Sequence, residues 1–99
     1  MNDHQLIASL RSIGMGCFVK YFEAFSNDKA VDEELTKALM QIEGYKENAA
    51  RTKVLQARRI IREGRTQDAL KKVMDSKKTE SWVVGKAQFL IENSIVVNL

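Results

Sequence analysis

Apolar side chains recur three or four residues apart through most of this chain, and glycines or short polar runs interrupt the pattern. This spacing lines one face of an α-helix, whereas a strand would alternate apolar and polar residues. Proline, which interrupts helices and marks many loops, does not occur at all. The sequence therefore predicts an all-α fold, a compact bundle of about five or six short helices joined by short connections.

The first two predicted helices supply the centre of the core. Residues 3–13 form one helix, with Asn2 or Asp3 as its N-cap and Gly14 as its stop. Its apolar face is made of Leu6, Ile7, Leu10 and Ile13. After a short turn, residues 17–25 form the second helix. Its inward side chains are expected to be Phe18, Val19, Phe22 and Phe25.

A third helix is predicted over residues 29–42, with Asp28 as its cap. Its inward side chains are expected to be Val31, Leu35, Ala38, Leu39 and Ile42. Its first turns carry the acidic trio Asp32, Glu33 and Glu34, where the helix dipole favours negative charge. Three adjacent carboxylates can also be read as a divalent-metal site. Neighbours on a helix point in different directions, however, and no second cluster adds ligands, so we expect no metal.

Two further helices are predicted on either side of a glycine stop. Residues 46–63 form the longer one, which Gly64 ends. Thr66 is expected to cap the helix that follows. The apolar side chains of that helix are Ala69, Leu70, Val73 and Met74.

The last part of the chain allows two interpretations. Residues 80–92 carry apolar side chains on every side, which fits either a well-buried helix capped by Thr79 or two strands around Gly85 and Lys86. The closing residues 95–99 are apolar and β-branched, so they also suit a short β element. We expect this closing segment to pack against its own chain or against a second copy.

Length and cysteine content indicate one domain in a reducing compartment. A chain of 99 residues has room for one helical domain, over residues 1–99, and for no deep substrate cavity. The single cysteine, Cys17, cannot form an intramolecular disulfide, which a secreted domain of this size usually needs. The first residues lack the basic start and apolar block of a signal peptide, and no segment approaches the ~20 apolar residues of a membrane span. We therefore expect a cytoplasmic protein with no membrane contact.

The positive charge of the chain belongs to one segment. Residues 45–78 hold eleven basic and four acidic side chains, whereas residues 1–44 hold four basic and seven acidic ones. Residues 79–99 hold one basic and two acidic side chains. A concentrated basic block on a nearly balanced chain indicates a directed electrostatic surface.

Residues 46–63 concentrate this charge on one helical face. At ~100° per residue, Leu55, Arg58 and Arg62 fall within ~40° of Arg51 and form a stripe. Beside the stripe lie Asn48, Thr52, Gln56 and Arg59. The opposite arc, which we expect to face the core, contains Ala49, Ala50, Lys53, Val54, Ala57, Ile60 and Ile61. Lys53 is the one charged side chain in that arc, and its long stem can carry its amino group out to water.

Residues 43–54, "EGYKENAARTKV", resemble the turn and the start of the recognition helix in winged helix-turn-helix DNA-binding domains. The resemblance covers about residues 39–59, a short helix, a turn at Gly44 and a longer helix with a basic outer face. It implies that a set of polar and apolar side chains approaches the DNA groove, namely Lys46, Asn48, Arg51, Thr52 and Leu55. It also implies that Ala49, Ala50 and Val54 pack against the preceding helix.

The leading expectation is a small protein that binds double-stranded DNA. Arginine can hold a phosphate or a guanine edge with two parallel hydrogen bonds, and threonine can contact phosphates or thymine methyl groups. We expect Arg51, Thr52 and Arg58 to reach base edges. We expect phosphates to be held by Arg59, Arg62, Arg65, Lys71 and Lys72. A homodimer closed by the C-terminal segment would place two such helices in successive major grooves.

A rival hypothesis assigns the same arginines to protein contacts. In that reading the chain is a helical interaction or oligomerisation module whose arginine face docks on an acidic partner or forms salt bridges within an oligomer. Glu47 and Glu63 are placed to pair with some of the arginines. Exposed arginines on a solvated helix face would look the same in the sequence.

Enzymatic chemistry is not indicated, and no cofactor is expected. His4 is the only histidine and Cys17 the only cysteine, so neither a zinc set nor a Ser/His/Asp arrangement can be assembled. Cys17 follows Gly16 near a predicted helix N-terminus, where a thiol can become reactive. The alternative, which we favour, is a buried small apolar side chain beside Phe18. The glycines form no phosphate-binding loop.

Overall fold

The structure is a computed structural model that describes the backbone of residues 1–97 and the side chains of residues 1–93. This part of the chain contains seven helices and no strand. The helices are α1 (Asp3–Ile13), α2 (Met15–Lys20), α3 (Phe22–Ser26), α4 (Asp32–Glu43), α5 (Glu47–Arg62), α6 (Thr66–Asp75) and α7 (Ser81–Val97). The all-α prediction is confirmed, although the chain is divided into more helices than the apolar pattern indicated.

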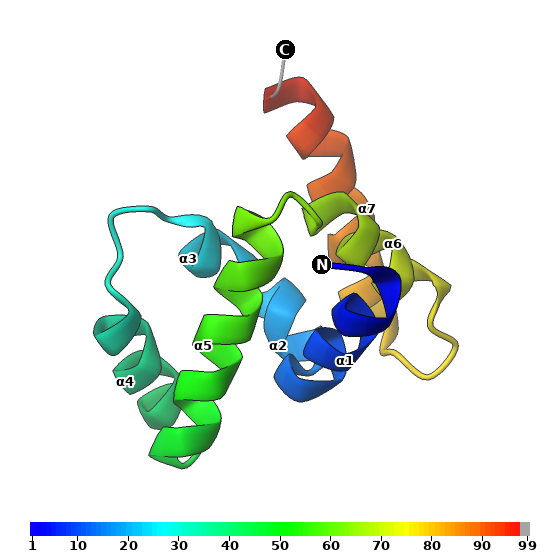
Figure 1. The fold of residues 1–99 in the computed structure, drawn as a ribbon. Coiled ribbons are helices and arrows are strands. Elements are labelled where there is room, and N and C mark those ends of the chain that lie inside the picture. The colour runs from blue at the N-terminus through cyan, green and yellow to red at the C-terminus, as the bar shows by residue number, and fades with distance from the viewer. Residues whose placement is uncertain (98–99) are drawn as a thin grey trace.

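Helix α5 runs through the middle of the fold, with α4 along one side and α1 on the other (Figure 1). Helices α6 and α7 pack on each other, and the last turns of α7 extend away from the remaining helices (Figure 1). The core forms where α1, α2, α5, α6 and α7 meet. Its largest fully buried side chains include Phe18, Leu6, Leu10, Ile13, Ile60 and Leu70.

The first helix has the predicted bounds because both of its ends carry local signals. The side chain of Asn2 accepts a hydrogen bond from the backbone N–H of Gln5 at 2.8 Å, and the side chain of Gln5 accepts one from the backbone N–H of Asn2 at 3.0 Å. This reciprocal pair is a capping box. Gly14 ends the helix with φ +88°, a backbone region that favours glycine.

The second predicted helix is wrong in one respect, because the chain forms two short helices, α2 and α3, instead of one. The break falls at Tyr21, whose backbone leaves the helical region. The hydroxyl of Tyr21 donates a hydrogen bond to Glu43 at the end of α4, so a contact with a distant helix accompanies the break. The expected aromatic centre is confirmed at Phe18 and Phe25, which are buried, whereas Phe22 is half-buried.

The start of α4 is the second correction. Its N-cap is Val31 instead of Asp28, because the preceding residues form a turn in which the side chain of Asn27 accepts a hydrogen bond from the backbone N–H of Lys29 at 3.1 Å. Val31 is therefore outside the helix and 56% exposed. Ile42, also expected inside, lies in the last turn and is 63% exposed. The acidic trio occupies the first turn, as predicted.

Helices α5, α6 and α7 lie close to their predicted positions, with differences at their first residues. Helix α5 is preceded by Lys46 as its N-cap and is followed by Gly64 with φ +73°. Thr66 is the first residue of α6 and not its cap, a position taken by Arg65. Residues 81–97 form one helix, so the two-strand alternative is wrong and no β element occurs as far as Val97. The expected packing of residues 95–99 concerns side chains outside the described residues.

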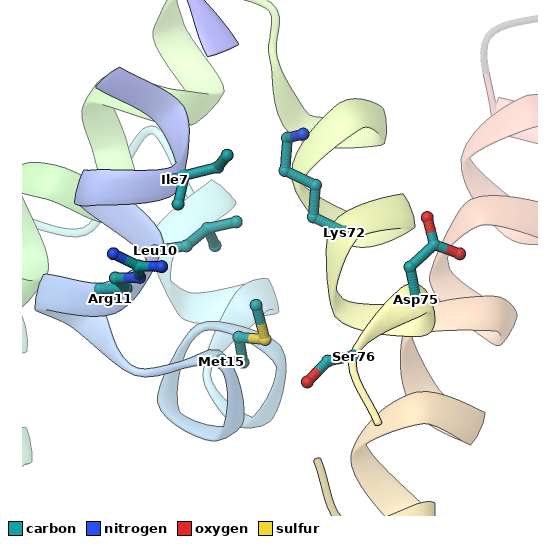
Figure 2. Close-up of a pocket in the computed structure, with 7 residues that line it drawn as sticks. All are labelled: Ile7, Leu10, Arg11, Met15, Lys72, Asp75 and Ser76. Atoms are coloured by element: carbon teal, nitrogen blue, oxygen red, sulfur yellow. The ribbon is translucent and has the colours of Figure 1, made fainter. Parts of the chain in front are cut away.

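An open groove of about 360 Å³ lies between α1 and α6 (Figure 2). Its floor includes Leu10 and Met15, and the groove leaves Ile7, which was expected to be buried, 38% exposed. The rest of the lining consists of Arg11, Lys72, Asp75 and Ser76. The carboxylate of Asp75 points away from the apolar floor (Figure 2). The groove brings together no histidine, cysteine or pair of carboxylates, so it offers no catalytic set.

Candidate interaction surfaces

The predicted arginine stripe of α5 lies beside the acidic start of α4. Arg51 forms an ion pair with Glu33 at 3.1 Å, and Arg58 forms one with Asp32 at 2.8 Å. Both arginines therefore reach across to α4, which runs alongside α5 (Figure 1). At Arg51 and Arg58 the stripe is therefore in contact with α4 and is not a free surface.

Arg51 is held by two carboxylates. In addition to Glu33, it pairs with Glu47 one turn earlier on α5 at 3.2 Å. The hydrogen bond to Glu47 and the one to Glu33 raise the pKa of Arg51. Its side chain is 39% exposed, so the pairing is a surface interaction in contact with water. Both carboxylates bond to the Nη2 of Arg51, and their negative charge would oppose a phosphate that approached the same guanidinium.

Arg58 is the most enclosed member of the stripe, with 19% of its side chain exposed. One terminal nitrogen donates to Asp32 at 2.8 Å, and the other donates to the backbone carbonyl of Asn27, also at 2.8 Å. Its Nε is buried and has no hydrogen-bond partner among the described residues. Arg58 thus connects α5 to the loop before α4 and is not available as a free guanidinium.

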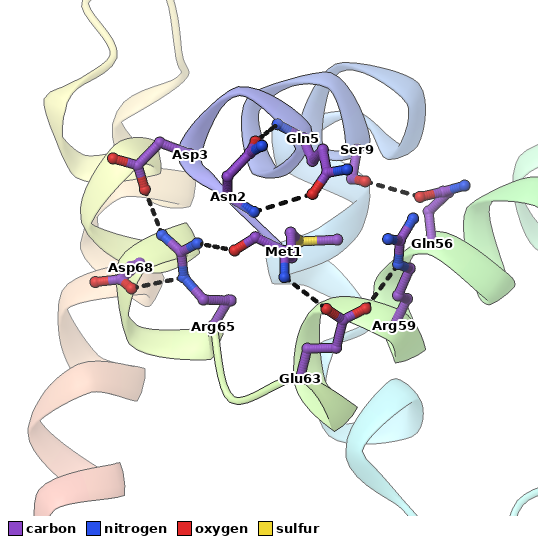
Figure 3. Close-up of polar contacts among 10 residues, drawn as sticks. All are labelled: Met1, Asn2, Asp3, Gln5, Ser9, Gln56, Arg59, Glu63, Arg65 and Asp68. Atoms are coloured by element: carbon purple, nitrogen blue, oxygen red, sulfur yellow. Dashed lines mark hydrogen bonds and ion pairs between the residues drawn. The ribbon is translucent and has the colours of Figure 1, made fainter.

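A polar network ties Arg59 to the N-terminus (Figure 3). The Nε of Arg59 donates to one oxygen of Glu63 at 2.7 Å, and the amino group of Met1 donates to the other at 2.8 Å. The hydrogen bond from the amino group of Met1, followed by the one from Arg59, lowers the pKa of the Glu63 carboxyl to about 2. Glu63 therefore stays charged far below neutral pH and holds both cations.

Arg65 is bound on three sides (Figure 3). It pairs with Asp3 in the first turn of α1 and, at 2.8 Å, with Asp68 in the first turn of α6. It also donates a hydrogen bond to the carbonyl of Met1. The bonds to Asp3 and Asp68 raise the pKa of Arg65, whose side chain is 18% exposed. Arg65 therefore joins α1 to the α5–α6 junction.

The other predicted site residues have no ion pair or hydrogen bond in the part of the chain whose side chains are described. Six of them are exposed and one, Lys72, is half-buried. The exposed ones are Lys46, Asn48, Thr52, Leu55, Arg62 and Lys71. They lie at the start, middle and end of α5 and on α6, with the paired arginines between them. The structure thus leaves a basic surface that is interrupted by internal ion pairs.

Two residues of the predicted core arc of α5 differ from expectation. Ala49 is exposed, although the resemblance to helix-turn-helix domains implies that it packs against the preceding helix. Lys53 is half-buried, and its amino group has partners in the chain. Its Nζ donates to the carbonyls of Ile13 at 2.8 Å and Ser12 at 3.3 Å and lies 4.7 Å from the ring centre of Tyr45. A cation in this place stabilises the C-terminus of α1.

Cys17 is buried in the core, in agreement with the reading as a small apolar side chain. Burial, the largest influence on this thiol, raises its pKa, so the reactive thiolate is disfavoured at neutral pH. The described side chains contain no cluster of three or more potential metal-ligating residues.

Helix α7 carries two large exposed aromatic side chains. Trp82 is 49% exposed and Phe89 is 59% exposed, and Gly85 lies between them on the same side of the helix. The indole N–H of Trp82 donates to Glu80 at 2.9 Å, so the polar atom of the ring already has a partner. We call Trp82, Gly85 and Phe89 the apolar strip. The described part of the chain covers it only in part.

Comparisons with protein-family models, with curated proteins and with solved structures find no match to this chain. None of the described helices is long and apolar enough to cross a membrane. Two surfaces of the molecule therefore bear on its function, the ion-paired face of α5 and the apolar strip of α7.

Proposed function

We propose that this protein is a helical protein-interaction module that associates through the apolar strip of α7 and has no nucleic-acid ligand. The observation that carries the proposal is the exposure of Trp82 and Phe89 on one side of a helix. Large aromatic side chains contribute most to protein interfaces, because they bury much apolar area with few rotatable bonds. Water contact with such a strip is unfavourable, and a protein partner removes it.

The ion pairs of α5 argue against double-stranded DNA as the partner. Four of the five arginines in residues 51–65 are bound to carboxylates of the same chain, namely Arg51, Arg58, Arg59 and Arg65. Asp32 and Glu33 would also stand beside any phosphate that approached the stripe and would repel it. Arg58 and Arg65 bond through two and three of their nitrogens, so each would have to lose an internal partner before it gained a two-pronged contact with a phosphate.

The likeness to helix-turn-helix domains is retained here as a proposal about shape. Helix α4, the turn at Gly44 and α5 follow one another in the order that the resemblance implies. A DNA-reading role needs the outer face of the second helix to be open. Since Arg51 and Arg58 bond to the first helix and the loop before it, we do not extend the likeness to DNA recognition.

The proposal includes two further points that follow from the sequence. The protein acts without catalysis, as a binding module, and it acts in the cytoplasm. A buried free thiol at Cys17 suits a reducing compartment. Cell fractionation checks this location, and recovery of the protein from an oxidising compartment would contradict it.

A duplex titration tests the exclusion of DNA. The full chain is added to a fluorescently labelled duplex at ~50 mM salt, where phosphate contacts are strong. We expect no measurable binding by the wild type or by the Arg62→Ala variant. Binding that weakens steeply with salt, and less steeply in Arg62→Ala, would mean that the arginine face is a nucleic-acid site and that the proposal is wrong.

Photo-crosslinking tests the strip itself. A photoreactive phenylalanine analogue replaces Phe89 in cells that produce the protein, and the matched control places the same analogue at Gln41, an exposed position on α4. We expect protein adducts from position 89 well above those from position 41. Equal yields from the two positions would show that the strip is not a preferred contact.

A further inference from the structure

We infer that the occupant of the apolar strip is a second copy of this chain, in an antiparallel pair of α7 helices whose two-fold axis passes beside Gly85. This inference rests on the proposed function, because it names the partner of the same surface. It adds the identity of the partner, the orientation of the two helices and the residue at their closest approach.

The strip is spaced as a helix–helix contact. At about 100° per residue, Trp82, Gly85 and Phe89 lie within about 60° of one another on α7. Their separations of three and four residues are those at which side chains line the contact between two packed helices. The buried side of α7, formed by Val83, Ala87 and Leu90, points in another direction and is used within the chain. The helix is therefore apolar on two sides, of which one has no partner in the described structure.

No contact among the described residues explains Gly85. Glycine is the least favourable helix-interior residue apart from proline. A Cβ added at Gly85 would meet nothing within 4 Å, so the fold does not need the absent side chain for space. Its backbone also lacks the positive φ that requires glycine at Gly14, Gly44 and Gly64. Close approach of a second helix is the remaining reason for a missing side chain on an exposed helical face.

The strip is complementary to itself. The position midway between Trp82 and Phe89 falls beside Gly85, so an antiparallel two-fold pairing sets Trp82 of one copy against Phe89 of the other. The two copies of Gly85 then meet near the axis, where the helices come closest. Large side chains thus lie on both sides of a small one, and both aromatic contacts form at once.

The charges at the ends of the strip favour the same arrangement. Glu92 lies beyond Phe89 at one end. At the other end Lys77 and Lys78 precede α7 together with Glu80, which accepts the indole N–H of Trp82, so this end keeps an excess of one positive charge. Antiparallel pairing brings Glu92 of each copy to the end where the two lysines of the other copy lie, and both lysines are exposed without a bonded partner among the described residues. Lys86, the cation nearest the axis, is already bound to Glu23 at 3.0 Å, so repulsion between the two copies of this residue is reduced.

Analytical ultracentrifugation of the full chain over a concentration series is the first test. We expect a monomer–dimer equilibrium in the wild type. Gly85→Ala should keep its helical content, melt at a higher temperature when dilute, and weaken dimerisation about tenfold, because a methyl group separates the two helices. Gln41→Ala, at an exposed position on α4 away from the strip, is the matched control and should dimerise as the wild type does. Unchanged or tighter dimerisation of Gly85→Ala would overturn the inference.

Charge-swap variants test the orientation. Trp82→Lys and Phe89→Glu each alter an exposed position, so both variants should fold but stay monomeric alone. Mixed in equal amounts they should form a heterodimer, because antiparallel pairing sets the introduced lysine against the introduced glutamate and keeps one aromatic contact. A parallel pair would oppose each introduced charge to an aromatic ring. Failure of the mixture to associate would therefore overturn the antiparallel pairing.

The outcomes separate this inference from the proposed function. A wild-type chain that stays monomeric at ~1 mM, above the dissociation constant of a functional homodimer, would overturn the second copy as partner. The function would still stand if position 89 crosslinks to another protein. Duplex binding, in contrast, would overturn the function itself. Adducts from position 89 with twice the mass of the chain support both.

Discussion

The outer faces of α5 and α7 differ in how far their side chains find partners within the chain. The outer face of α5 carries four arginines, and carboxylates from α4, from α5 itself and from Glu63 just after it pair with three of them. The outer face of α7 carries two aromatic rings that the described residues cover only in part. The arginine-rich face of α5, which is the more distinctive of the two in the sequence, is therefore the one whose side chains already form contacts within the fold.

The difference follows from the reach of the side chains. Arginine has a long flexible stem, so it can find a carboxylate on another helix without a change in the backbone. Arg65 does so with Asp3, from which it is separated by 62 residues in the chain. The rings of Trp82 and Phe89 can be covered only if another surface packs against them. The charges of a helix face can all find ion-pair partners within a small domain. A helix that carries apolar side chains on every side, in contrast, cannot be fully buried by a domain of this size.

The largest expected effect separates the two sides of α7. Leu90 is 8% exposed and its neighbour Phe89 is 59% exposed. Leu90→Ala should cost about 3 kcal/mol in the free energy of unfolding, because it leaves a cavity in the core. Phe89→Ala should cost less than about 1 kcal/mol, since its ring lies largely in solvent. Urea denaturation at a concentration where the chain is monomeric measures both. Equal costs would mean that the strip belongs to the core of its own chain.

A smaller effect separates two arginines of the α5 stripe. Arg58→Ala should lower the free energy of unfolding by about 2 kcal/mol, because it removes charged hydrogen bonds to Asp32 and to the carbonyl of Asn27. Arg62→Ala should change it by no more than about 0.5 kcal/mol, because Arg62 is exposed and has no bonded partner among the described residues. Thermal or urea unfolding of the two variants provides the measurement. A negligible loss in Arg58→Ala would show that its ion pair does not hold α5 to α4.

The smallest expected effect is a dependence on pH. Folding lowers the pKa of Glu63 from 4.5 to about 2, so the charged carboxylate is favoured in the folded state. Its contribution to stability is fully present above pH 4.5 and is lost as the pH falls through about 2. Melting temperatures between these values should fall less steeply in Glu63→Gln than in the wild type. Some slope should remain, because the pKa values of Asp3 and Glu43 are also lowered. Parallel curves would contradict the role assigned to Glu63.

The parts of the fold that could be predicted are those with local signals. The bounds of α1 follow from the Asn2–Gln5 capping box and from Gly14, and the end of α5 follows from Gly64. The break at Tyr21 has no glycine or proline to mark it and is accompanied by a contact with Glu43, a residue on another helix. The late start of α4 depends on the Asn27 turn, a weaker signal than the acidic residues that follow it.

The residues of the two candidate surfaces could be identified from the sequence, but which of them are exposed could not. The pairs of Arg51 with Glu47 and of Arg59 with Glu63 are four residues apart on one helix and can be read from the sequence. The pair of Arg58 with Asp32 joins residues 26 positions apart, so only the packing of α4 on α5 reveals it. Residues 80–92 are apolar on every side, so the sequence alone does not show which of them are exposed. The structure identifies the apolar strip because it shows which side of α7 packs against the core.

The fluorescence of Trp82 tests the central claim most directly, because it is the only tryptophan and lies in the strip. Emission is recorded as the protein concentration rises, at low and at high salt, and again with a duplex oligonucleotide present. We predict a shift to shorter wavelength with concentration that persists at high salt, since apolar burial is not screened, and no response to the duplex. Emission that ignores concentration but responds to the duplex, and loses that response as salt rises, would contradict the account.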